Sequence, residues 1–155
     1  MEDNNKYKFC WYDAEEKLST KEQERVVKFL YTALGRFRDN AEEIQKAIDY
    51  ALKKVPSFGG FIGILREDDD IVGATVVIAT GMNGYIPSYI LVYIAVDESK
   101  RGAGLGKSII QEIIKKTNGG IALHVEPDNP AKNLYERMGF TNKYLEMRYT
   151  HTDEK

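Results

Sequence analysis

A glycine-rich turn between two regular segments constrains this chain of 155 residues most strongly. The run Ser88 to Val96 is nearly all apolar or aromatic, which is typical of a strand covered on both faces. The turn Arg101 to Gly106 follows with glycine at alternate positions, and a helix is expected after it. Glycines let a backbone bend tightly and approach a ligand, and the first amides of a helix attract anions. The sequence therefore predicts a strand–turn–helix unit that can hold a phosphate group, with Arg101 and Lys107 adding positive charge.

The turn fits neither of two common nucleotide-binding motifs. A Walker A loop needs glycine five residues before Gly106 of Gly106-Lys107-Ser108, and Arg101 occupies that position. A dinucleotide fingerprint starting at Gly102 needs glycine at position 107, which holds Lys107. A plain strand-to-helix turn and a nucleotide-dependent enzyme both stay open on this segment alone.

Two motifs together resemble the GNAT family of N-acetyltransferases. Arg101-x-x-Gly104-x-Gly106 matches the Arg/Gln-x-x-Gly-x-Gly/Ala loop that binds the pyrophosphate of coenzyme A in that family. The downstream segment from Asn129 to Phe140 is similar to the family signature Asn-x-x-Ala-x-x-Leu-Tyr-Glu-Lys-x-Gly-Phe. It departs from that signature in having alanine at 131 rather than 132, and Arg137 in place of lysine. The resemblance covers about residues 60 to 150.

The resemblance implies acetyl-CoA as co-substrate and an amine-bearing acceptor, with direct attack in a ternary complex. The main chain of the apolar strand would pair with the pantetheine arm, and the turn would hold the pyrophosphate. The cofactor-binding residues implied in this way are Ile94, Ala95, Val96, Arg101, Gly102, Ala103, Gly104, Leu105, Gly106, Lys107, Asn129 and Tyr135. Asn129 can also cap the helix that it precedes.

Tyr135 is the candidate general acid. It follows Asn129 by six residues, which is less than two helical turns. Acetyl transfer expels a thiolate that must gain a proton, and a tyrosine within hydrogen-bond reach can supply it. The family uses tyrosine at this place for that role. Packing under the sheet is the alternative for Tyr135.

The general base is left open. A free alkyl ammonium has a pKa near ~10 and must lose a proton before attack, but residues 88–96 contain no carboxylate. His124 and Glu126 are two apart on a predicted strand, so they are expected to share a face. Histidine as a residue type is chemically suited to act as a base, and His124 aligns with a glutamate base in acetyltransferases that modify ribosomal-protein N-termini. A purely structural histidine and a water chain without a dedicated base are the alternatives.

The remaining patterns predict one domain, residues 1–155, of the α/β (α+β) class. Clustered strands followed by alternating units indicate a mixed, mostly antiparallel central sheet flanked by helices, and the resemblance implies the acyl-CoA N-acyltransferase (GNAT) fold. The expected strands are 6–12, 58–65, 71–80, 88–96, 121–125 and 143–149, and the expected helices are 20–34, 40–55, 107–117 and 129–138.

Composition argues against several classes of function. The 24 acidic and 22 basic residues give a net charge of −2, without the basic excess of a nucleic-acid binder. The single cysteine excludes a disulfide framework, and no cluster has metal-ligand spacing. No apolar run reaches the ~20 residues that span a bilayer, and the first residues lack the features of a secretory signal. We expect a cytoplasmic protein without metal, membrane or nucleic acid, and dimers are common in the family.

The acceptor is not identified by these patterns. The resemblance makes the loop 35–40 a candidate for shaping the acceptor site, where Arg36 and Arg38 recognise an acidic substrate or, as we favour, are simply solvated. Tyr89 and Tyr93 are predicted to share one face of their strand, as core residues or as an acceptor pocket. A catalytically silent module that binds acetyl-CoA is the alternative to an enzyme.

Overall fold

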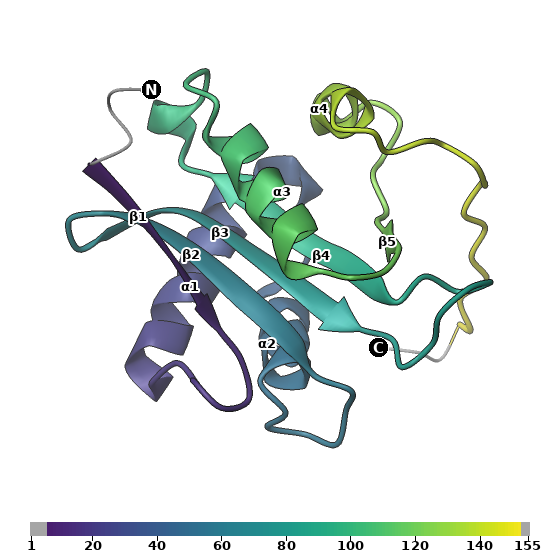
Figure 1. Cartoon of the computed structure of the whole chain (residues 1–155), viewed down its shortest axis with the longest axis horizontal. Helices are drawn as coiled ribbons and strands as arrows, with labels where there is room; N and C mark the ends of the chain where they lie inside the picture. The colour runs from purple at the N-terminus through teal and green to yellow at the C-terminus, as the bar shows by residue number, and fades with distance from the viewer. Residues whose placement is uncertain (1–5, 153–155) are drawn as a thin grey trace. The chain divides into compact units, whose positions relative to one another are not determined.

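The computed structural model describes residues 6–152, and Figure 1 shows its elements. The strands are β1 (Tyr7–Tyr12), β2 (Gly60–Glu67), β3 (Asp70–Ala79), β4 (Tyr89–Val96) and β5 (Ile121–Ala122); the α-helices are α1 (Thr20–Ala33), α2 (Ala41–Ala51), α3 (Leu105–Lys116) and α4 (Ala131–Arg137). Two short 3-10 helices, Gly35–Phe37 and Glu98–Lys100, precede α2 and α3. The expectation of no secretory signal rests partly on residues 1–5, which lie outside the described residues.

The chain folds into two compact units, Met1–Leu123 and His124–Lys155. The first unit holds the sheet together with α1, α2 and α3, and the second holds α4. Among the described helices, none combines the length and the apolar character that crossing a bilayer demands.

The sheet has the order β1-β2-β3-β4-β5, so every strand lies beside its neighbour in sequence. The first three pairings are antiparallel and the pairing of β4 with β5 is parallel. The predicted mixed, mostly antiparallel sheet is therefore confirmed. The tight β2–β3 turn has Asp68 at a φ of 55°, a left-handed conformation that aspartate tolerates better than most residues.

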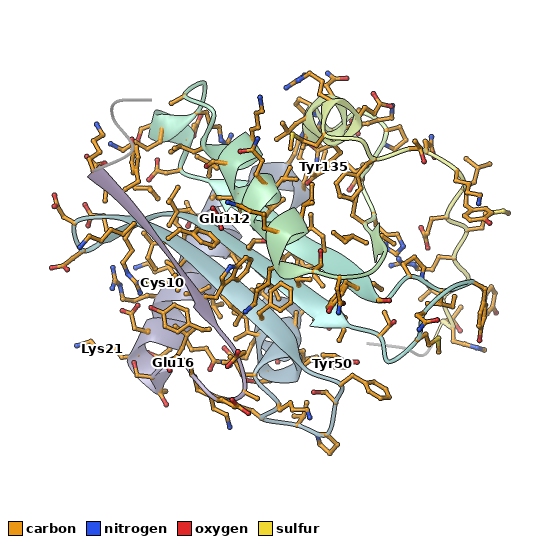
Figure 2. The ribbon with its side chains drawn as sticks, viewed as in Figure 1. Cys10, Glu16, Lys21, Tyr50, Glu112 and Tyr135 are labelled. Carbon is orange, nitrogen blue, oxygen red and sulfur yellow. The ribbon has the colours of Figure 1, made fainter. Side chains whose placement is uncertain are left out.

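Helices cover both faces of the sheet, with α1 and α2 behind it and α3 in front of it in Figure 1. Both rear helices begin at a side-chain cap, because Ser19 and Asn40 accept hydrogen bonds from the amides of Glu22 and Glu43. Their apolar stripes pack on the sheet, and this core contains Leu18, Val26, Leu30, Ile44, Ile48, Ala51, Leu52, Ile62, Ile64, Ala74, Val76, Tyr93 and Ala95. Tyr50, labelled in Figure 2, ties α2 to the sheet by donating to the carbonyl of Ala79 at 2.9 Å.

A β-bulge in β4 changes which face its side chains occupy. Val76 pairs with Tyr93, but the next residue of β3, Val77, pairs with Leu91, so Val92 is the extra residue. Tyr93 consequently joins the core under α1 and α2 and is only 8% exposed. Tyr89 contacts Phe61 on the opposite face. The prediction that the two tyrosines share a face is therefore wrong, because the alternation restarts at the bulge.

Two further predictions about strands are wrong. The expected strand 121–125 ends at Ala122, so no strand fixes the relative faces of His124 and Glu126. The expected last strand, 143–149, is irregular and exposed. Its alternating pattern is suitable for a strand, but among the described residues no strand pairs with it, and a strand exists only through backbone hydrogen bonds to a neighbour.

Candidate active site

The glycine-rich turn exposes a row of backbone donors at the start of α3. Gly104 caps the helix in a left-handed conformation with a φ of 82°, and Gly102 has a φ of 89°. No described residue accepts a hydrogen bond from the amides of residues 102–107. An added Cβ at either glycine would meet no atom within 4 Å. The turn thus has both the free amides and the open space that a phosphate group requires.

Arg101 is used inside the fold rather than over these amides. Its Nε donates to the carbonyl of Val96 at 3.0 Å, and an Nη donates to the carbonyl of Ala33 at 2.7 Å. The first contact fixes the turn against the end of β4, and the second satisfies a carbonyl at the end of α1. The acceptors are neutral carbonyls, so Arg101 keeps its positive charge beside the turn, and Lys107 is the second cation there; the amide of Lys107 is also one of the free donors.

The strand before the turn has one open edge. β5 pairs only with Tyr89 and Ile90, so in the described sheet residues 91–96 of β4 have a strand neighbour on the β3 side alone. Ile94, Ala95 and Val96, the residues expected to bind the cofactor through their main chain, lie on this edge. An extended ligand can pair there as an added strand would.

Two side chains hold the bulge in place. Thr75 of β3 is fully buried, and its hydroxyl donates to the carbonyl of Tyr93 at 2.7 Å. The hydroxyl of Tyr93 donates to the carboxylate of Asp39, in the loop before α2, at 2.5 Å. Burial, this hydrogen bond and the nearby charge of Glu43 raise the pKa of Tyr93 well above its ordinary value. Tyr93 is therefore held at both its carbonyl and its hydroxyl.

The second unit carries the candidate acid. Tyr135 lies on α4, as Figure 2 shows, and its ring packs on Phe140 with 5.9 Å between centroids. Burial raises the pKa of Tyr135 to about 12, so the phenol keeps its proton at neutral pH. The side-chain oxygen of Asn129 accepts a hydrogen bond from the amide of Ala131 at 2.9 Å, although the N-cap position of α4 is Pro130 and not Asn129 as expected.

The two candidate bases, His124 and Glu126, both lie in the irregular segment between β5 and α4, and both side chains are exposed. Within residues 6–152, no three His, Cys, Asp or Glu side chains are grouped so that they could hold a metal ion. Sequence reasoning missed Asp39 and Thr75. A threonine inside the apolar segment of β3 is a visible signal, whereas the pairing of Asp39 with a residue 54 positions away has none.

Comparisons with known proteins agree with this architecture. Residues 59–142 match the family model described as an acetyltransferase (GNAT) domain. No curated protein matches the chain.

Among solved structures, a possible acetyltransferase from Clostridium difficile 630 is 15% identical with a TM-score of 0.68, and the match covers 96% of this chain and 99% of that one. A GNAT family protein from Streptococcus pneumoniae TIGR4 is 19% identical with the same TM-score, over 95% and 99% of the two chains. An aminoglycoside acetyltransferase from an uncultured soil sample, solved with sisomicin, is 16% identical with a TM-score of 0.62, over 97% and 99%.

These structures share the fold, and the family model covers the sheet from β2, the glycine-rich turn and α4. The model match spans more than half of the 155 residues. The chain belongs to the GNAT family of acetyltransferases.

Proposed function

We propose that the chain is an acetyl-CoA-dependent N-acetyltransferase that transfers an acetyl group to a primary amine by direct attack in a ternary complex. The whole chain, residues 1–155, would act as a single domain. The observation that carries the proposal is the row of free amides at residues 102–107, around two glycines with open space beside them. It lies at the end of a strand edge that an extended ligand can join.

The backbone groups of the glycine-rich turn and of β4 match the successive parts of acetyl-CoA, from its pyrophosphate to its thioester. Residues 102–107 bind the pyrophosphate through their amides, and Lys107 adds charge, while Arg101 holds the turn in shape. The main chain of Ile94, Ala95 and Val96 pairs with the pantetheine arm. By the family signature, Asn129 and Tyr135 complete the cofactor site. Bound acetyl-CoA supplies a thioester carbonyl that an amine can attack.

The chain's own groups then assist the transfer. Backbone amides of β4 near the bulge polarise the thioester carbonyl, as oxyanion-hole donors do. Tyr135, whose pKa is raised by burial and which therefore carries its proton at neutral pH as an ordinary tyrosine does, donates that proton to the departing thiolate. His124 is the proposed base; its exposed position allows it to receive the amine proton through water.

We further propose a cytoplasmic enzyme that needs no metal and binds neither nucleic acid nor membrane, with a homodimer as the form to test first. The alternative function is a catalytically silent module that binds acetyl-CoA. It is favoured by the lack of any carboxylate on β4.

Thermal unfolding with acetyl-CoA, coenzyme A, ATP–magnesium or no ligand tests the cofactor. A ligand at ~100 times its dissociation constant adds about 2.7 kcal/mol of stability, which shifts Tm by roughly several degrees at this size. We expect a shift with acetyl-CoA and coenzyme A only. A shift with ATP–magnesium alone would replace the proposal by a nucleotide-dependent enzyme.

Thiol release with a panel of primary amines separates the enzyme from the silent module. The enzyme releases coenzyme A thiol with at least one amine above the rate without acceptor. A protein that binds acetyl-CoA but releases no thiol with any amine would be the binding module.

A further inference from the structure

The loop before α2 presents a carboxylate that is held in position but not neutralised. Asp39 is exposed, and it accepts a hydrogen bond from Tyr93. Among residues 6–152, no Lys, Arg or His forms an ion pair with it. Because the ring of Tyr93 is buried in the core, its hydroxyl fixes where the carboxylate lies.

The cations closest in sequence have other contacts. The guanidinium of Arg38 lies 4.1 Å from the ring centroid of Tyr31 and donates to the Tyr31 hydroxyl and to the carbonyl of Gly35, each at 3.2 Å. The guanidinium of Arg36 lies 4.3 Å from the ring centroid of Phe37. The guanidinium groups of both arginines therefore pack on aromatic rings, and neither forms an ion pair with Asp39.

A second acidic group adds to the negative field around Tyr93. The charge of Glu43 on α2 contributes to the raised pKa of Tyr93, and Glu43 itself is paired with Lys46 at 3.4 Å. A positively charged group placed beside Tyr93 would therefore be attracted to the carboxylate of Asp39, and an anionic group would be repelled by it.

The position of Tyr93 on β4 places this charge next to the reacting end of the cofactor, an argument that rests on the proposed function. A cofactor whose pyrophosphate lies at residues 102–107 and whose arm runs back along Val96, Ala95 and Ile94 ends beside the bulge. Each further residue along the strand adds about 3.3 Å. Tyr93 is the next residue in that direction, and its side chain leads to Asp39.

We propose that Asp39, positioned by Tyr93, binds the positively charged acceptor and makes the enzyme selective for cationic amines. Asp39 contacts the acceptor directly and sets its affinity. Tyr93 acts through Asp39 and is a positioning residue. In this assignment the loop 35–40 recognises a cationic acceptor through Asp39. It does not recognise an acidic substrate through Arg36 and Arg38, which was one alternative from the sequence.

The test uses three acceptors with the same reacting amine and different second groups: 1,4-diaminobutane, butylamine and 4-aminobutanoate. With the wild-type chain we expect kcat/KM to fall in that order. Asp39→Asn should raise KM for the diamine about five- to tenfold, as expected for losing a partly exposed charge-assisted contact. The value of kcat and the affinity for acetyl-CoA should stay within about twofold. Tyr93→Phe should raise KM in the same direction, by less.

Glu42→Gln is the matched control, because it removes one exposed negative charge three residues away on α2 and should leave all three acceptors unchanged. An equal KM in Asp39→Asn and wild type, or a wild type that does not favour the diamine, would overturn the assignment.

Binding of 1,4-diaminobutane to the protein–coenzyme A complex, followed by calorimetry, separates this proposal from the proposed reaction. If the wild type releases no thiol with any probe but binds the diamine, and Asp39→Asn does not, the site stands and acetyl transfer fails. If the wild type does not bind the diamine, the proposed role of Asp39 is wrong.

Discussion

At the scale of single residues, the glycine-rich turn depends on the backbone conformation of its glycines and on the hydrogen bonds of Arg101. Gly102 and Gly104 are suited to the turn because they have no side chain. A side chain at either position would be strained and would occupy the space beside the free amides. Arg101 acts through its side chain, because its guanidinium donates to two backbone carbonyls and so fixes the turn while its positive charge stays beside it. The motif could be recognised in the sequence, but the hydrogen bonds of Arg101 to the backbone could not be predicted from it.

Gly104→Leu should weaken binding of acetyl-CoA by tenfold or more, because the new side chain lies beside the amides that bind phosphate. Gly84→Leu is a matched control: Gly84 also has a positive φ, 98°, and open space around it, but it lies in the loop before β4. Both variants therefore carry similar backbone strain. Calorimetric titration of both proteins checks the prediction, which does not survive if their affinities for acetyl-CoA are equal.

Tyr135→Phe should lower kcat tenfold or more and change the affinity for acetyl-CoA little, because the ring can still pack on Phe140 while the proton donor is lost. The exposed Tyr144 of the same unit supplies the control, since Tyr144→Phe should leave kcat unchanged. Initial rates of thiol release measure both. Wild-type kcat in Tyr135→Phe would remove this tyrosine as the acid.

At the scale of elements, most helices and strands were predictable because their apolar periodicity is strong. The hairpin β2–β3, the helices α1 and α2 and the strand–turn–helix unit of β4 and α3 all follow from local pattern. The failures have one physical origin, which is that pairing between strands is not a local property. The bulge at Val92 and the unpaired segment 143–149 both depend on what lies beside a strand, and the contact between Asp39 and Tyr93 depends on the same bulge.

Thr75→Val should test the support of the bulge. The substitution keeps the shape of the side chain but removes the donor to the carbonyl of Tyr93, so we expect a loss of about 1–2 kcal/mol in the free energy of unfolding. Thr32→Val, at an exposed position on α1, should change it by no more than about 0.5 kcal/mol. Urea unfolding monitored through Trp11 gives both values. Equal midpoints would mean that Thr75 contributes nothing to holding the strand.

At the scale of the whole molecule, the proposal of one domain makes a thermodynamic prediction. If residues 1–155 unfold as one cooperative system, calorimetry should show a single transition whose calorimetric and van't Hoff enthalpies agree. The heat-capacity change should be about 2 kcal/mol/K for a chain of this length. Two resolved transitions would mean that the units Met1–Leu123 and His124–Lys155 fold independently, and the single-domain proposal would be wrong.

The extra residue in β4 also has a consequence for how this strand can change. Leu91 and Tyr93 are two residues apart, and in a regular strand they would point to the same face of the sheet. Because Val92 is an extra residue between them, they point to opposite faces. Deleting Val92 itself would join Leu91 directly to Tyr93, and the two residues would face Val77 and Val76, which are also adjacent, in a regular register. Every side chain of the strand would then keep its layer, and only the irregularity would be lost. A deletion elsewhere in the strand would instead turn all the side chains on one side of it to the other layer. The bulge therefore marks a point where the chain can lose one residue without exchanging inside for outside.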